Sequence, residues 1–142
     1  MSRFSDKINI LKHLNVFRIW NLALLYLSYY WSKLVKKGKH LGKPFALSIE
    51  PTTACNLGCP ECPSGLKQFT RDTGKISVSK HQDWMENLPK SVFYINYYFQ
   101  GEPFLHPQFL ELISAAKKQR IYTATSTNAH FISAKKASEI VA

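Results

Sequence analysis

The chain has 142 residues, of which 45% are hydrophobic and 13% are aromatic. This composition excludes an intrinsically disordered protein and fits one domain or part of a larger one. The formal net charge of +10 is unevenly distributed: residues 1–43 carry nine Lys or Arg against one acid, and residues 44–142 carry ten against eight. The balance is therefore +8 in the first part and +2 in the second. The positive charge is therefore informative about the partner of the N-terminal segment. Because residues 44–142 are nearly neutral, nucleic acid is not expected as their partner.

Residues 8–37 contain no Pro or Gly and predict one long amphipathic helix. Its apolar centre, residues 19–31, would be about 20 Å long, short of the ~30 Å hydrocarbon core of a bilayer. Two roles remain open for this segment. One is peripheral contact with an anionic membrane or a partner, favoured by the lysines at its end. The other is packing on the protein's own domain or on a second subunit.

No small-residue cleavage site follows this apolar stretch, so no signal peptide is expected. We therefore expect a cytoplasmic protein, with membrane association as a further option. In that compartment thiols stay reduced, and clustered cysteines more often bind metal than form disulfides.

Glycines and a proline at residues 38–44 predict a boundary between an N-terminal helical segment, 1–43, and a catalytic body, 44–142. In the body, predicted strands at 45–50, 92–99 and 121–125 alternate with predicted helices at 79–90 and 107–120 and a last one that opens near Ser133. Ser79 is the expected cap of the first of these helices. The order β-α-β-α-β-α predicts an α/β fold with parallel strands.

Three unusual stretches follow the ends of the three predicted strands. They are the cysteine-rich loop, the turn 101–103 (Gly-Glu-Pro) and the stretch 126–128 (Ser-Thr-Asn). In a parallel sheet the carboxyl ends of the strands share one edge, where ligands bind. The sequence therefore predicts that all three stretches meet at one site.

The cysteines are spaced C-x3-C-x2-C, as Cys55, Cys59 and Cys62, and they are the only cysteines of the chain. Structural zinc sites usually have four protein ligands, and a second cysteine pair is lacking here. A histidine is an alternative fourth ligand, although none stands at the usual short spacing; the candidates are His81, His106 and His130. Thiolates also hold iron–sulfur clusters, and a 4Fe-4S cluster on three cysteines keeps one iron open to an outside ligand.

These residues resemble the radical S-adenosylmethionine (radical SAM) superfamily. The resemblance covers about residues 45–130 and rests on the three cysteines after the first strand, on Gln100-Gly101-Glu102-Pro103 after the second, and on Ser126-Thr127-Asn128 after the third. It implies a partial parallel (β/α) barrel, here with about three βα units. The form of the cysteine loop is similar to the subgroup that carries a further cysteine-rich (SPASM-type) domain and acts on peptides or proteins.

The resemblance implies a 4Fe-4S cluster held by Cys55, Cys59 and Cys62, with S-adenosylmethionine (SAM) chelating the fourth iron. Reductive cleavage of SAM then gives a 5'-deoxyadenosyl radical that abstracts hydrogen from the substrate. Gly101, Glu102 and Pro103 match the turn that receives the SAM amino group, and Ser126 and Asn128 match positions near its methionyl or ribose part. An electron donor such as a flavodoxin or ferredoxin is also implied.

Two positions depart from the pattern of the family: Gln100 stands where a glycine is frequent, and Glu61 where an aromatic residue is frequent. The body also supplies three βα units where a barrel of this type needs about six. We therefore expect an N-terminal fragment of a longer enzyme, poorly stable and inactive on its own. The alternative class is a non-catalytic iron–sulfur or zinc-binding module, and the residues leave the substrate open.

Overall fold

The computed structural model describes residues 3–141. Three parallel strands form one sheet in the order β1 (Ala46–Ser48), β2 (Tyr94–Asn96) and β3 (Tyr122–Ala124). Leu47 pairs with Ile95, and Ile95 pairs with Thr123. The predicted α/β class, the parallel pairing and the alternation of strands and helices along the chain are confirmed. Each strand is shorter than predicted, because only three residues in each are paired on this small sheet.

A helix follows each strand along the chain: α3 (Val78–Asn87), α4 (Phe109–Lys118) and α5 (Ala134–Val141). A short 3-10 helix, η1 (Pro103–Leu105), precedes α4. Ser77 caps α3 by accepting the backbone N–H of Lys80, so the predicted cap at Ser79 is wrong by two residues. The buried residues of α4 are Phe109, Leu112 and Ala116, and they share one face of the helix.

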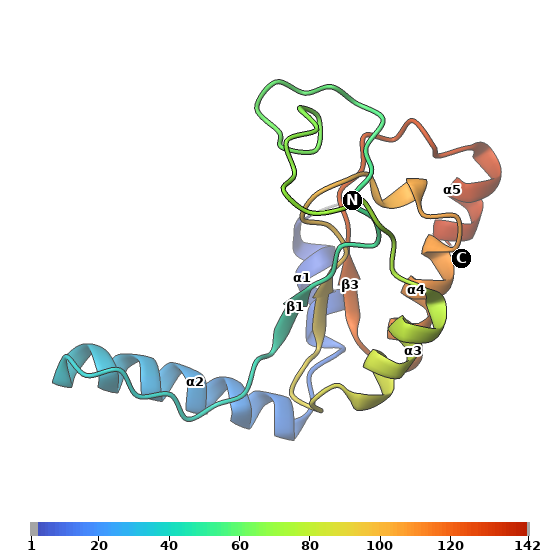
Figure 1. Cartoon of the computed structure of the whole chain (residues 1–142). Helices are drawn as coiled ribbons and strands as arrows, with labels where there is room; N and C mark the ends of the chain where they lie inside the picture. The colour runs from blue at the N-terminus through green and yellow to red at the C-terminus, as the bar shows by residue number, and fades with distance from the viewer. Residues whose placement is uncertain (1–2, 142) are drawn as a thin grey trace.

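Helices α3 and α4 pack against each other on one side of the sheet (Figure 1). The core lies there and consists of Ile49, Met85, Val92, Ile95, Tyr97, Phe104, Phe109, Leu112, Ala116 and Ile121. Strand residues that flank the buried Ile95, such as Tyr94 and Asn96, are only half-buried. Tyr94 stacks on Tyr122 of the next strand, with ring centroids 5.6 Å apart. The sheet therefore has one fully packed face and one partly open face.

The N-terminal segment forms two helices, α1 (Arg3–Leu11) and α2 (Val16–Val35), where one helix over 8–37 was predicted. The break has a local cause. Asn15 has an extended backbone and its side chain accepts the N–H of Arg18 at 2.9 Å, which makes it the N-cap of a new helix. From this break α2 projects away from the body as an arm (Figure 1). No helix in the described part of the chain is long and apolar enough to cross a membrane.

The root of this arm is attached to the sheet through Arg18, which is buried. Its guanidinium donates to four backbone carbonyl oxygens, those of His13, Lys90, Val92 and Arg120, at 2.6 to 3.2 Å. Lys90 and Val92 precede β2, and Arg120 precedes β3. The arm is thus anchored at the amino ends of the strands, opposite the edge where the cysteine loop emerges.

Candidate functional site

The cysteine loop is closed at its base by a short stem. Thr52 forms an isolated antiparallel bridge with Lys75, the N–H of Ile76 donates to the carbonyl of Pro51 at 3.0 Å, and Gly74 exchanges hydrogen bonds with Thr53. Loops whose ends meet in this way are compact surface units that often carry function. The stem fixes where the cysteine loop leaves β1.

Inside the loop, the turn around the second and third cysteines is built from backbone contacts. The N–H of Cys62 donates to the carbonyl of Cys59, and the N–H of Leu66 donates to the carbonyl of Cys62 at 2.9 Å. Gly65 packs against the backbone of Cys59 so closely that a Cβ at this position would collide with it. Glycine at 65 is therefore required by the turn that presents Cys59 and Cys62.

Gly101 holds the second stretch of the site against the start of the cysteine loop. Its φ is +78°, and a Cβ here would collide with the carbonyl oxygen of Thr52. The next N–H, of Glu102, donates to the carbonyl of Ala54 at 2.8 Å. The space that the missing side chain leaves is therefore filled by the protein's own backbone just before Cys55.

Gln100 contacts the cysteine loop directly. Its Oε1 accepts the hydroxyl of Ser64 at 2.9 Å and lies 3.6 Å from Sγ of Cys62. The same hydroxyl of Ser64 accepts the N–H of Gly101 at 3.0 Å. The departure from the glycine of the family thus has a structural role, because the longer side chain connects the second strand's turn to the third cysteine.

Glu102 is buried, with 2% of its surface exposed, and it joins the second and third stretches. Its Oε1 accepts the N–H of Phe104 at 3.0 Å and the hydroxyl of Thr127 at 2.6 Å, while its Oε2 accepts the N–H of Asn128 at 2.8 Å. Most of its acceptor capacity is used within the protein. Pro103, also buried, begins η1 directly after it.

The third stretch reaches the cysteine loop through an amide pair. Nδ2 of Asn128 donates to Oδ1 of Asn56 at 2.9 Å, and Asn56 is the residue after Cys55. Asn56 also contacts the ring of His130 at 3.2 Å. Ser126 lies in the same loop and is exposed. The cysteine loop, the turn 100–103 and the stretch 126–128 therefore meet at one edge of the sheet.

The three thiols are free, with Cys59 exposed and the other two half-buried. Among residues 3–141, no group of three or more Cys, His, Asp or Glu side chains is arranged to hold a metal ion. The loop thus brings the cysteines to one end of the sheet without gathering their sulfur atoms. Backbone N–H groups of Gly65 and Ser64 lower the pKa of the Cys62 thiol from its ordinary value, which favours its thiolate form.

Two of the three candidate histidine ligands are engaged elsewhere. His81 is completely buried, and its Nε2 lies 2.7 Å from the hydroxyl of Tyr97 in the core. His106 is also buried, with Nε2 donating to the carbonyl of Ile76 and Nδ1 accepting the N–H of Gln108. Only His130 lies beside the cysteine loop, which weakens the case for a zinc site completed by histidine.

Sequence reasoning missed the side chains that connect the three stretches, which are Asn56, Ser64, Gln100 as a contact residue, and Thr127. Small polar residues of this kind are common in turns, so the spacing gave no reason to single them out. The one available signal was Gln100, because it stands where the resemblance leads one to expect glycine.

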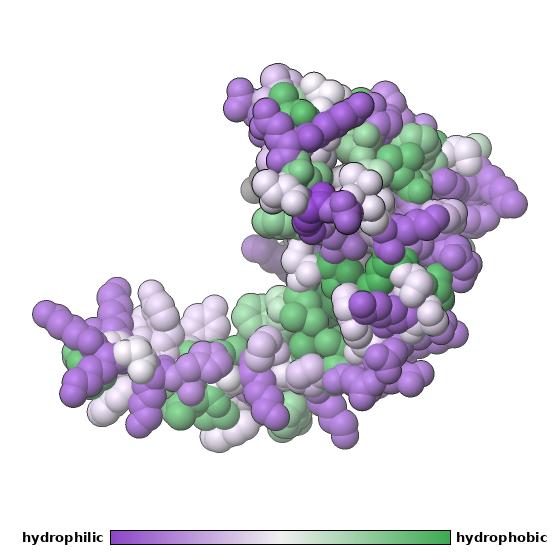
Figure 2. All heavy atoms as spheres, in the orientation of Figure 1, coloured by the Kyte–Doolittle hydropathy of each residue, from purple (hydrophilic) through white to green (hydrophobic). Residues whose placement is uncertain are grey.

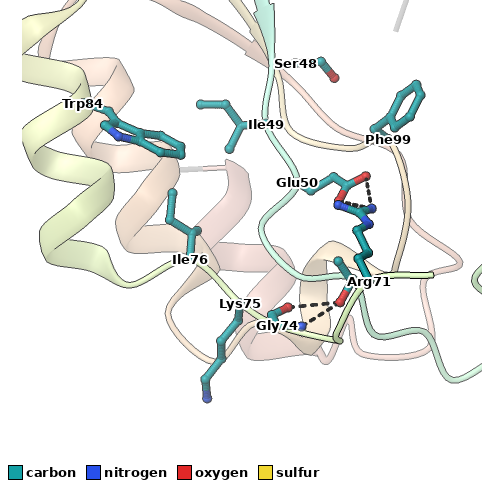
Figure 3. A pocket seen from close by; sticks show the side chains of 10 residues that line it. Ser48, Ile49, Glu50, Arg71, Gly74, Lys75, Ile76, Trp84 and Phe99 are labelled. Atoms are coloured by element: carbon teal, nitrogen blue, oxygen red, sulfur yellow. Dashed lines mark hydrogen bonds and ion pairs between the residues drawn. The ribbon is translucent and has the colours of Figure 1, made fainter. Parts of the chain in front are cut away.

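A pocket of about 610 Å³ opens beside the stem of the loop, at the carboxyl end of β1 (Figure 3). Its apolar wall includes Ile49, Ile76 and Trp84. Across from them, Arg71 forms a two-point ion pair with Glu50, at 2.8 and 3.1 Å. The pocket therefore combines an apolar wall with a charged pair next to the cysteine loop.

Comparison with known proteins finds relatives that align with about two thirds of the chain. The chain is 37% identical over 98 residues to mycofactocin maturase MftC of Mycobacterium ulcerans and 33% identical over 103 residues to that of Mycolicibacterium smegmatis. These alignments cover 68% and 72% of the chain and 26% of each relative. The chain thus spans about a quarter of the length of these curated relatives. No family model matches the sequence.

The crystal structure of BtrN in complex with AdoMet and 2-DOIA superposes with a TM-score of 0.62, at 23% identity, over 71% of this chain and 43% of that one. An open conformation of BtrN gives a TM-score of 0.58 at 22% identity. The fold is that of a parallel α/β protein in which the loops after the three strands contact one another at one edge of the sheet. These similarities agree with the resemblance to the radical SAM superfamily that the sequence motifs carry.

Proposed function

We propose that the chain carries the cluster-binding and SAM-binding part of a radical SAM enzyme, with Cys55, Cys59 and Cys62 as the cluster ligands. The observation that carries this proposal is the contact of three separate loops at one edge of the sheet. The donor set fits the cluster: three free thiols lie in one closed loop, and one of them has a lowered pKa. A cluster on three thiolates leaves one iron for an outside ligand.

The protein's own residues would hold and orient the ligands. Glu102 would act by fixing the turn, because its oxygens already accept three hydrogen bonds from neighbouring residues. The SAM amino group would then meet the Gly101–Pro103 turn, and Ser126 and Asn128 would lie near its methionyl or ribose part. When bound, the cluster supplies the electron for reductive cleavage of SAM.

We propose a peptide or protein as the substrate class. The curated relatives are named maturases, a word for enzymes that modify a precursor. The pocket beside the loop stem, with Trp84 on one side and Arg71 on the other, has the mixture of apolar and charged surface that suits a peptide side chain. A flavodoxin or ferredoxin in the cytoplasm would supply electrons.

Anaerobic reconstitution with iron and sulfide tests this proposal. We expect a brown 4Fe-4S species whose electronic spectrum changes when SAM is added. Serine in place of any one of the three cysteines should lower the iron content sharply, whereas Gly58→Ala in the same loop should not, because a Cβ there meets no neighbour within 4 Å. An iron–sulfur species whose electronic spectrum does not change on addition of SAM would support a non-catalytic carrier. Tightly bound zinc without iron would support a zinc module. Either result contradicts the proposal.

A further inference from the structure

The arm formed by α2 turns its polar side chains inward. Arg18, Asn21 and Ser28 are the buried residues of this helix. Asn21 exchanges two hydrogen bonds with the backbone of Lys43, at 2.8 and 2.9 Å, and Ser32 exchanges two with the backbone of Lys39, at 2.8 Å each. The segment after α2 therefore returns along the helix and covers its polar stripe (Figure 1).

The outward side of the arm is apolar and uncovered. More than half of the surface of each of ten large side chains is exposed: Val16, Phe17, Ile19, Trp20, Tyr26, Leu27, Tyr29, Tyr30, Trp31 and Leu34. Val16, Trp20, Leu27 and Leu34 recur at helical spacing and share one face. An exposed patch of this size is unusual on a monomer and indicates an interaction surface.

The charges around this patch have one sign. Between Asp6 and Glu50 the chain contains no acidic residue. Lysines gather at the free end of the arm and on the returning segment, and all are exposed: Lys33, Lys36, Lys37, Lys39 and Lys43. Figure 2 shows this end of the arm mainly in hydrophilic purple, with pale and green residues between it and the body. The surface that fits the arm must therefore be apolar and negatively charged.

We propose that α2 lies flat in the interface of a membrane rich in anionic phospholipids. The apolar face would enter the boundary between headgroups and acyl chains, where Trp and Tyr side chains are favoured. The lysines would meet the negative headgroups, each strengthening binding about fivefold. The 20 residues of α2 are typical of helices that lie in a membrane interface. The polar side chains of Asn21 and Ser32, on its inward side, already have hydrogen-bond partners in the returning segment.

A second copy of the chain is a poorer occupant. A parallel pair of arms would place the two lysine clusters next to each other, and an antiparallel pair would place each cluster beside a segment that has no acid to receive it. The positions that flank the apolar stripe are also apolar, such as Tyr26 and Trp31, whereas paired helices usually carry complementary charges there.

Vesicle binding by the purified chain is the direct test and needs no cluster. We expect co-sedimentation with phosphatidylcholine vesicles that contain phosphatidylglycerol, binding at least tenfold weaker to phosphatidylcholine alone, and a decrease with added salt. Tryptophan fluorescence should be quenched by brominated lipids, since two of the three tryptophans, Trp20 and Trp31, lie on the arm.

Matched variants separate the two components of binding. Leu27→Glu with Tyr30→Glu should abolish binding, whereas Ile140→Glu with Val141→Glu, at exposed positions of α5, should not. Gln in place of Lys36, Lys37 and Lys39 should weaken binding roughly a hundredfold. The same triple change at Lys117, Lys118 and Lys135, also exposed, should have little effect.

Three outcomes would overturn the proposal. The first is absence of binding to anionic vesicles by the full chain while its circular dichroism shows a folded protein. The second is a concentration-dependent dimer that Leu27→Glu dissolves, without vesicle binding. The third is protection of the arm tryptophans from acrylamide in the absence of lipid, which would mean that protein already covers this face.

Discussion

The side chain of Glu102 accepts the backbone N–H of Asn128 at 2.8 Å, across 26 residues of sequence. One residue belongs to the turn after β2 and the other to the stretch after β3, so a single buried carboxylate holds two neighbouring loops at the site edge. The same carboxylate also accepts the hydroxyl of Thr127. The shape of the site therefore depends on the charge and on both oxygens of Glu102.

Glu102→Gln should destabilise the protein by about 2–3 kcal/mol, because an amide places a donor where one of the carboxylate oxygens accepts. Urea unfolding measures this change. Glu86→Gln, on an exposed position of α3, is the control and should stay within about 0.5 kcal/mol of the parent. Equal effects of the two substitutions would show that Glu102 does not hold the loops.

Gly101→Ala should cost at least about 2 kcal/mol. The positive φ of +78° disfavours any residue with a Cβ, and the Cβ would collide with the carbonyl of Thr52. Thermal or urea unfolding checks the loss, with Gly58→Ala as the comparison, since that position has open space. A Gly101→Ala protein as stable as Gly58→Ala would contradict the close packing of the turn.

Gln100→Ala should loosen the cysteine loop with little effect on global stability. The substitution removes the hydrogen bond to Ser64 and the contact with the sulfur of Cys62, both at a half-buried surface. Hydrogen exchange over residues 59–68 should become faster, while exchange in β2 stays unchanged. Gln119→Ala, exposed at the end of α4, is the matched control. If the rate of hydrogen exchange in the loop stays unchanged in Gln100→Ala, Gln100 does not connect the turn to the cysteine loop.

His81 should make the protein less stable in mild acid. Burial and, secondarily, the nearby His106 lower its pKa below the ordinary value of 6.5. The unfolded chain therefore binds this proton more readily, so stability is fully present above about pH 6.5 and falls as the pH drops through the folded pKa.

The urea midpoint at about pH 7.5 and about pH 5 measures this loss. His81→Gln should show a smaller difference between the two pH values than the parent. His40→Gln, at an exposed position, should keep the difference of the parent. A parent protein whose midpoint rises on acidification would contradict the sign of this linkage.

The sequence alone was sufficient for the alternation of strands and helices and for the parallel direction of the strands, because alternating βα units permit few arrangements. It was sufficient for the common edge of the three stretches for the same reason. It was not sufficient for the break before α2, since Asn15 reads as an ordinary helix residue until its side chain is seen to accept the N–H of Arg18.

The orientation of α2 was also beyond sequence reasoning. The polar stripe with Arg18 and Asn21 reads as the solvent side of an amphipathic helix, yet both residues are buried. The reason is that their partners are backbone carbonyls and amides of distant segments, such as that of Lys43, which leave no pattern in the side chains. The contacts of Glu102 with the N–H groups of Phe104 and Asn128 likewise leave no pattern in the sequence.

The guanidinium of Arg18 is bound by four backbone carbonyls, and these hydrogen bonds restrict rotation of α2 relative to the sheet. A surface that binds α2 would therefore also set the orientation of the sheet relative to that surface. Because the anchor and the cysteine loop lie at opposite ends of the strands, that surface would also set the direction from which a bulky substrate approaches the thiols.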